Sequence, residues 1–297
     1  MSERTPNIHP LACVDPDARL AADVRVGPFC VVGPGVTIAE GCVLHDHVTI
    51  LGPTDVGARN VLHPYAVIGA APQDLKYKGG PTRVLIGADN CFREHVTIHR
   101  GTEVDRESGG VTRIGNHNHI MVGVHIAHDA RIGSHTIIAN QVQIAGHVHI
   151  DDHVNIGGIV GIHHFTTIGR FAFVTGMTRV PFDVPPFTIV SGLDADVRAI
   201  NAEGLKRWNV PAESIAALKD AFKLVYGKRL AGSAGNTEAA LAEIESNGLA
   251  RDEYVRELAR FLRLQLRAPS GRIREALRTD VPADRAAFYT AAEEATA

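Results

Sequence analysis

Aliphatic residues recur at every sixth position over most of the first 180 residues, with polar residues and glycine between them. The series is unbroken from Ile8 to Ile68 and from Ile114 to Val180, and it reappears briefly over 86–98. The fourth residue after each aliphatic is usually small or β-branched, as at Cys30 and Cys42. Such hexapeptides are typical of a parallel β-helix, in which three of them form one triangular coil of 18 residues.

Two interruptions of the repeat predict loops that project from the prism, at 70–83 and 100–112. The first keeps the phase of the repeat, whereas the second shifts it by two residues, because Ile98 and Ile114 are 16 residues apart. Insertions that leave a solenoid core intact often carry binding function.

Helical spacing replaces the sixfold pattern after Pro185 and Pro186. We therefore predict a mainly β fold, with a parallel β-helix over 1–190 followed by an α-helical C-terminal domain over 191–297 that covers the open end of the prism. Apolar residues at 215, 218, 222 and 225 predict a first helix after Pro211. Further helices are expected over 237–246, 251–267, 271–278 and 283–294.

Composition narrows the class of protein. The 297 residues carry a net charge of −3, and this near-neutral balance argues against a nucleic-acid binder. No apolar run is long enough to span a membrane, and the first ten residues lack the pattern of a secretory signal. The four cysteines are far apart in the sequence, which favours buried thiols over a disulfide or zinc framework and predicts a cytoplasmic location.

Stacked coils bring residues 18 apart into vertical columns. His128, Gly146 and His164 share one column, and Asp129 and His147 share the next. Histidine is suited to general base catalysis near neutral pH, and a glycine N–H one coil away is suited to an oxyanion. Strand alternation predicts that Asp129 points away from His128 unless a corner intervenes, so no simple dyad of these neighbours is expected.

A second set of histidines, at 117, 135 and 153, has the same 18-residue spacing. No other candidate catalytic residue accompanies it, so we interpret this set as a structural ladder of stacked side chains.

Six motifs resemble those of the bacterial UDP-N-acetylglucosamine 3-O-acyltransferase family, in the same order along the chain. They are QDLKY at 73–77, TIHRGT at 97–102, HIAHD at 125–129, IAGHV at 144–148, DVPP at 183–186 and EGLKR at 203–207. The resemblance implies a left-handed β-helix and a homotrimer with active sites between neighbouring prisms. It also implies the first step of lipid A synthesis, in which acyl carrier protein donates a 3-hydroxyacyl group to the sugar 3-hydroxyl of UDP-N-acetylglucosamine.

The resemblance also implies roles for single residues. His128 would be the general base and Gly146 the oxyanion donor. No metal or cofactor would take part beyond the phosphopantetheine thioester of the carrier protein. The positions expected to bind or orient the nucleotide sugar are Asp74, Lys76, His99, His125, His147, His164, Asn201, Glu203 and Arg207. The acyl groove is expected near Gly176 and Asp194.

Several positions depart from the family pattern. His164 replaces a usual Gln, Trp208 a second Arg, Asp194 a common His and Thr175 a Gly. These departures leave acyl length open, and they leave open a sugar with an amino group at carbon 3. In the expected helix over 251–267, four arginines share one face and form a candidate surface for the acidic carrier protein or an ordinary solvated face: Arg256, Arg260, Arg263 and Arg267.

Three alternative functions share the repeat. A zinc lyase of the γ-carbonic anhydrase type uses histidine ligands at a trimer interface, but that pattern gives no reason for QDLKY or EGLKR. A non-catalytic binding solenoid would not explain the two loops together with His128 and Gly146. The related N-acyltransferase usually has an additional N-terminal domain, whereas here the repeat begins at Ile8.

Overall fold

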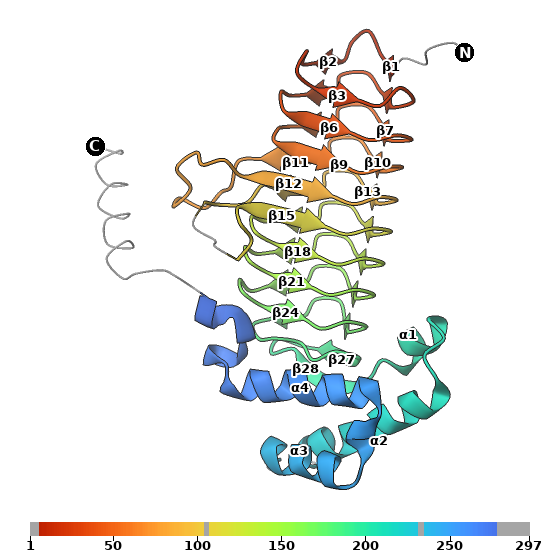
Figure 1. Ribbon diagram of the computed structural model, residues 1–297, viewed down its shortest axis with the longest axis vertical. Coiled ribbons are helices and arrows are strands. Elements are labelled where there is room, and N and C mark those ends of the chain that lie inside the picture. Colours follow the sequence, from red (N-terminus) through yellow and green to blue (C-terminus); the bar gives the residue numbers. More distant parts are fainter. Residues whose placement is uncertain (1–5, 104–106, 231–234, 278–297) are drawn as a thin grey trace.

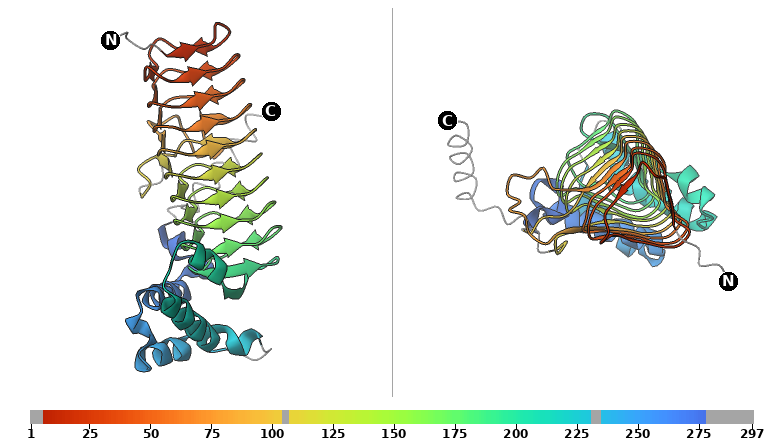
Figure 2. Two further views of the ribbon diagram at one scale, coloured as in Figure 1. Left: turned by 90° about the vertical axis from the view of Figure 1, so that its right-hand side faces the viewer. Right: turned by 90° about the horizontal axis from the view of Figure 1, so that it is seen from above.

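The computed structural model describes residues 6–103, 107–230 and 235–277, and it shows a triangular prism with a helical domain at one end (Figure 1). Viewed along the prism axis, the coils superpose as triangles (Figure 2). The faces are three sheets whose strands pair in parallel, except for the last pair, β27 and β28. The predicted fold class, a β-helix followed by helices, is confirmed.

Each sheet takes one strand from every coil. The eleven-stranded sheet contains β1 (Asn7–Ile8), β4 (Arg25–Val26), β7 (Val43–Leu44), β10 (Val61–Leu62), β13 (Cys91–Phe92), β16 (His119–Ile120), β19 (Ile137–Ile138), β22 (Asn155–Ile156), β25 (Phe173–Val174), β27 (Thr188–Ser191) and β28 (Asp196–Ile200). The nine-stranded sheet contains β2 (Cys13–Val14), β5 (Val31–Val32), β8 (Thr49–Ile50), β11 (Val67–Ala70), β14 (Thr97–His99), β17 (His125–Ile126), β20 (Gln143–Ile144), β23 (Gly161–Ile162) and β26 (Arg179–Val180). The eight-stranded sheet contains β3 (Arg19–Leu20), β6 (Val36–Ile38), β9 (Thr54–Val56), β12 (Arg83–Ile86), β15 (Val111–Ile114), β18 (Arg131–Ile132), β21 (His149–Ile150) and β24 (Thr167–Ile168).

The sixfold aliphatic residues fill the inside of the prism. Ile126, Ile144 and Ile162 pair in register on successive coils, and Ile126 and Ile144 are fully buried. The small position of the hexapeptide also points inward, which explains the burial of Cys30 and Cys42. The aliphatic and small positions of the hexapeptide repeat are therefore the positions that form the core of the prism.

The third residue after most inward aliphatics turns a corner in the left-handed backbone conformation. Non-glycine residues adopt it sixteen times in the repeat: Phe29, His47, Arg59, Tyr65, Asp89, His95, His117, Asp129, His135, Gln141, His147, His153, Ile159, Phe165, Phe171 and Met177. This conformation is unfavourable for residues with a side chain. Stacking between successive rings compensates for part of that cost.

The histidine ladder lies at the corner between the eight-stranded and eleven-stranded sheets, here called the ladder corner. The ring centroids of His117 and His135 are 4.8 Å apart, those of His135 and His153 are 5.1 Å apart, and Phe171 continues the stack. Trp208 packs against His135 and His153 from the side. The stacked arrangement predicted from the 18-residue spacing is confirmed.

Both predicted loops leave the corner between the nine-stranded and eight-stranded sheets, here called the site corner. They connect β11 to β12 and β14 to β15, on consecutive coils. The loops contact each other, because the Lys78 N–H donates to Glu103 at 2.6 Å and the Arg100 guanidinium donates to the Tyr77 hydroxyl. Two loops thus extend from one edge of the prism (Figure 1).

The helical region begins after β28, so the predicted division between residues 190 and 191 falls within β27. It contains α1 (Ala202–Arg207), α2 (Ala212–Leu230), α3 (Thr237–Ser246), η1 (Leu249–Arg251), α4 (Glu253–Arg267), η2 (Pro269–Gly271) and η3 (Ile273–Leu277). The helix expected over 271–278 is replaced by short 3₁₀ turns, since Ser270 and Gly271 have positive φ. The helix expected over 283–294 lies outside the described residues.

The helical region has its own core, which packs on the end of the prism. Leu205, Leu218 and Leu258 are almost fully buried and cluster with Phe187 of the last coil. Within the described part of the chain, no helix has the length and apolar character needed to cross a membrane.

Candidate active site

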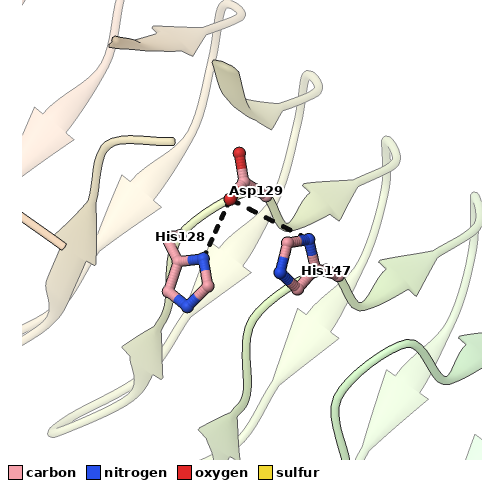
Figure 3. Close-up of side chains that lie close together, drawn as sticks. All are labelled: His128, Asp129 and His147. Atoms are coloured by element: carbon pink, nitrogen blue, oxygen red, sulfur yellow. Dashed lines mark hydrogen bonds and ion pairs between the residues drawn. The ribbon is translucent and has the colours of Figure 1, made fainter. Parts of the chain in front are cut away.

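The site corner brings His128 and Asp129 together, contrary to the expectation from strand alternation. Asp129 has a φ of 59°, so the chain turns at this residue and the two side chains meet on the same side. The Nδ1 atom of His128 lies 2.9 Å from Oδ2 of Asp129 (Figure 3). The expectation of no dyad is therefore wrong, because a corner intervenes.

Asp129 is buried and accepts hydrogen bonds from several donors of the second loop. The Thr102 N–H donates to Oδ1 at 2.9 Å, and the Thr102 hydroxyl donates to Oδ2 at 2.6 Å. The Ser108 hydroxyl donates to Oδ1 at 2.7 Å. Both carboxylate oxygens are thus acceptors, which fixes Nδ1 of His128 as a donor and leaves its Nε2 atom without a proton in the neutral ring.

His147 and Gly146 complete the corner one coil further on. The His147 ring meets the His128 ring edge to face at 4.9 Å and stacks on Phe165 at 4.3 Å. A Cβ atom at residue 146 would lie 2.6 Å from Nε2 of His128, so this position requires glycine. Within the described residues the Gly146 N–H donates no hydrogen bond, which leaves it available to a bound oxygen.

A pocket of about 200 Å³ opens above this corner. Four of the nine predicted sugar-binding residues line it, namely Asp74, Lys76, His147 and His164, together with His128, Ala145, Gly146 and Phe165. Asp74 belongs to the first loop, and its Oδ2 atom lies 3.8 Å from Nε2 of His128 across the pocket. The loop on an earlier coil therefore closes over the histidine.

A longer groove of about 550 Å³ shares Asp74 and His128 with the pocket and follows the nine-stranded sheet to Arg179 and Pro181. It is apolar over much of its lining, which includes Ala127 and Ala145. The pocket and the groove therefore meet at His128, and polar side chains line the pocket whereas the groove is largely apolar.

His125 lines the groove on the same coil as His128, and His99 lies on the preceding coil. The Thr97 hydroxyl is 2.8 Å from Nδ1 of His125, and the His99 ring meets His125 edge to face. Burial, together with the nearby His125 and His128, lowers the pKa of His99 to about 4. Burial and then His128 also lower the pKa of His125. The pair is thus held in its neutral form near pH 7.

Three predicted nucleotide-binding residues lie elsewhere in the single chain. Asn201 caps α1, accepts the Gly204 N–H and donates to the Phe171 carbonyl; Glu203 pairs with Lys206. Their helix precedes Trp208 at the ladder corner, on the opposite side of the prism from the loops, and Arg207 is its last residue (Figures 1 and 2).

The two predicted acyl-groove residues are not part of the pocket lining. Gly176 packs against the backbone of Gly158, so closely that a Cβ atom at residue 176 would lie 3.3 Å from the Gly158 carbonyl oxygen. Asp194 forms an ion pair of 3.0 Å with Arg179, the residue at the far end of the groove.

Sequence reasoning missed the roles of Thr102, Ser108 and Arg274. Arg274 is buried and donates to the His147 carbonyl and to Glu107. No sequence signal placed the second loop over Asp129. The left-handed corner at Asp129, in contrast, lies at a fixed position of the hexapeptide and could have been found.

One atom each from His128, Asp129 and His147 lie within 4.8 Å of one another, close enough to suggest a metal site. The donor set argues against it. The Oδ2 atom of Asp129 already accepts the Thr102 hydroxyl and faces His128 Nδ1, so binding a cation there would break both contacts. The geometry favours a hydrogen-bonded His–Asp dyad over a metal centre.

The chain is similar to known proteins both in sequence and in structure. A family described as UDP N-acetylglucosamine O-acyltransferase, domain 2, matches residues 183–270, and the bacterial transferase hexapeptide family matches 17–52 and 112–146. The chain is similar to the acyl-[acyl-carrier-protein]–UDP-N-acetylglucosamine O-acyltransferases of Saccharophagus degradans and Stutzerimonas stutzeri. They are 48% and 45% identical, over 80% and 83% of this chain and 89% and 92% of theirs. The solved structure of LpxA from Acinetobacter baumannii is also similar, with a TM-score of 0.78 and 41% identity over 85% of this chain and 95% of that one.

Proposed function

This chain belongs to the UDP-N-acetylglucosamine O-acyltransferase family and is an O-acyltransferase, and we propose that its reaction takes place at His128, Asp129 and Gly146. The reaction moves a 3-hydroxyacyl group from the thioester of acyl carrier protein to the 3-hydroxyl of UDP-N-acetylglucosamine, as the first step of lipid A biosynthesis. The observation that carries the proposal is the 2.9 Å contact between His128 Nδ1 and Asp129, which turns Nε2 toward the pocket.

His128 acts as the general base. With Nδ1–H donated to Asp129, Nε2 accepts the proton of the sugar hydroxyl as that oxygen attacks the thioester carbonyl carbon. The Asp129 carboxylate stabilises the imidazolium that forms. When the tetrahedral intermediate collapses, the C–S bond breaks and the imidazolium returns the proton to the departing thiolate.

The Gly146 N–H stabilises the oxyanion of that intermediate. It lies beside the His128 ring and has no competing acceptor in the described part of the chain. Preorganised donors of this kind contribute about 10²–10³-fold to rates of acyl transfer.

Replacing Gly146 with alanine is expected to lower kcat about 10²–10³-fold, because the new methyl group would displace the His128 ring and block the N–H. The fold should survive, since Gly146 is not among the residues with positive φ. Steady-state kinetics and thermal unfolding measure the two effects. Gly227→Ala in α2, where a Cβ meets nothing within 4 Å, is the control and should leave the rate unchanged. A Gly146→Ala enzyme with more than a tenth of normal activity contradicts this role.

The remaining lining residues fit the substrates. Asp74, Lys76, His147 and His164 offer polar groups to the sugar and phosphates, and the largely apolar groove past Ala145 offers room for the acyl chain. His125 lines the groove, and His99 packs against it from the preceding coil. The chemistry needs no metal or cofactor beyond the phosphopantetheine thioester.

The active assembly in this proposal is a homotrimer in the cytoplasm. Asn201, Glu203 and Arg207 are on the side of the prism away from His128, so a nucleotide sugar bound by both sets would require α1 of a neighbouring copy. Asp194 and Gly176 would then border the acyl chain at the far end of the groove, where Asp194 pairs with Arg179.

Mass spectrometry of the products tests the function directly. The protein would be incubated with UDP-N-acetylglucosamine and a ladder of 3-hydroxyacyl carrier proteins, with and without a chelator. We expect a UDP-sugar heavier by one hydroxyacyl group at one preferred length, in equal yield with the chelator. If product forms only with a UDP-sugar that has an amino group at carbon 3, that sugar is the acceptor in place of UDP-N-acetylglucosamine. If the chelator abolishes product, the metal-free mechanism is wrong.

A further inference from the structure

The chain returns to the site corner after its last long helix. The short turns η2 and η3 lie on the same side of the prism as the two loops (dark blue in Figure 1). We call residues 269–277 the C-terminal strap. The Asp183 carboxylate accepts the Ile273 N–H at 2.5 Å, and the buried Arg272 donates to the Pro181 carbonyl at 2.7 Å. These bonds attach the strap to the last coil.

Beyond these anchors the strap reaches the catalytic corner through Arg274, whose side chain is buried. One of its terminal nitrogens, Nη1, donates to the His147 carbonyl. The other, Nη2, donates to Oε2 of Glu107 in the second loop at 2.7 Å. A planar guanidinium with donors in a fixed fork is suited to holding two acceptors in a defined relation.

The two acceptors adjoin the two halves of the catalytic machinery. His147 follows Gly146, the oxyanion donor, and its ring contacts His128. Glu107 precedes Ser108, whose hydroxyl donates to Asp129 at 2.7 Å. Arg274 therefore connects the corner that carries the oxyanion donor to the loop that orients the base.

We propose that Arg274 is a positioning residue for acyl transfer, which fixes Gly146 and the His128–Asp129 dyad relative to each other by bonding His147 and Glu107 at once. The inference rests on the proposed roles of His128 and Gly146. A change in this alignment affects the transition state, in which base and oxyanion donor act together, more than it affects substrate binding.

Kinetics of Arg274→Gln, Glu107→Gln and the double variant test the proposal in the full-length chain. We expect each single variant to lose about tenfold in kcat, with KM for both substrates within about twofold, since small misplacements act on the chemical step. The double variant should be no slower than the slower single variant, because both changes break the same connection. Arg251→Gln, on the exposed η1, removes the same charge and should be fully active.

Other results would overturn the proposal. The proposal is contradicted if Arg274→Gln folds and has a normal kcat, or if its defect appears only as a raised KM. It is also contradicted if the double variant loses the product of the two single-variant factors in kcat. If Arg274→Gln fails to fold, Arg274→Lys is the second variant, because it keeps the positive charge and loses the forked donors. It should still show the kcat defect. A normal kcat in Arg274→Lys would contradict the proposal. His128→Ala measured in parallel separates the two claims, because full activity in that variant would instead remove the proposed site.

Discussion

Replacement of His128 by alanine is expected to reduce kcat by about 10³–10⁴-fold, the largest loss from any single side chain in this site. The His128 imidazole combines a nitrogen that faces the pocket with a 2.9 Å contact to a buried carboxylate, whereas Nδ1 of His147 lies 3.9 Å from the same carboxylate. Without the His128 imidazole, the sugar hydroxyl must lose its proton to solvent.

The loss should appear in kcat far more than in KM, because proton transfer belongs to the transition state. Thermal unfolding should change little, since His128 stays at the rim of the pocket and outside the aliphatic core. His117→Ala, which removes an exposed ring from the ladder corner, is a matched control and should be fully active. A His128→Ala enzyme with more than a tenth of normal kcat would exclude His128 as the base.

The sequence predicts the fold well because the hexapeptide repeat directly encodes the inward positions. Every coil places its aliphatic residue in the same direction, so stacking His128 over Gly146 needs only the 18-residue period. The repeat length alone brings the two residues together, and a Cβ atom at residue 146 would lie within 2.6 Å of Nε2 of His128.

The partner of His128 could not be deduced from alternation, because alternation fails where the chain turns. Asp129 occupies the left-handed position of its hexapeptide, and the turn directs it back toward its neighbour. A rule for corners, in place of a rule for strands, would have predicted the contact.

Long-range contacts of irregular segments stay beyond sequence reasoning for a different reason. The position of Ser108 over Asp129 depends on how the second loop folds back, and a shift of two residues in the repeat says nothing about that path. The contact between Arg274 and the His147 carbonyl depends on the turn at Ser270 and Gly271, where the chain leaves the axis of α4 and continues along the site corner.

Asp129→Asn is expected to lower kcat by about 10³–10⁴-fold while leaving the overall fold intact, because the amide is nearly isosteric with the carboxylate. Every described contact of the Asp129 oxygens comes from a group that can donate, namely Thr102, Ser108, His128 and, at 3.9 Å from Oδ2, Nδ1 of His147. An amide NH₂ must therefore face at least one of them. If it faces His128, Nδ1 becomes the acceptor, the proton moves to Nε2, and the ring can no longer take a proton from the sugar.

If the amide instead faces Thr102 and Ser108, it confronts a backbone N–H that cannot reverse its role, and the loop is forced off the corner. Both orientations impair the base, so the loss should persist across the pH range in which the enzyme is folded. Asp152→Asn is the matched control, because that carboxylate accepts the Ser134 N–H at 2.6 Å in the same kind of coil and has no contact with the pocket. Near-normal kcat in Asp129→Asn would show that His128 needs no carboxylate to hold its tautomer. The contact between the two side chains would then have no role in catalysis.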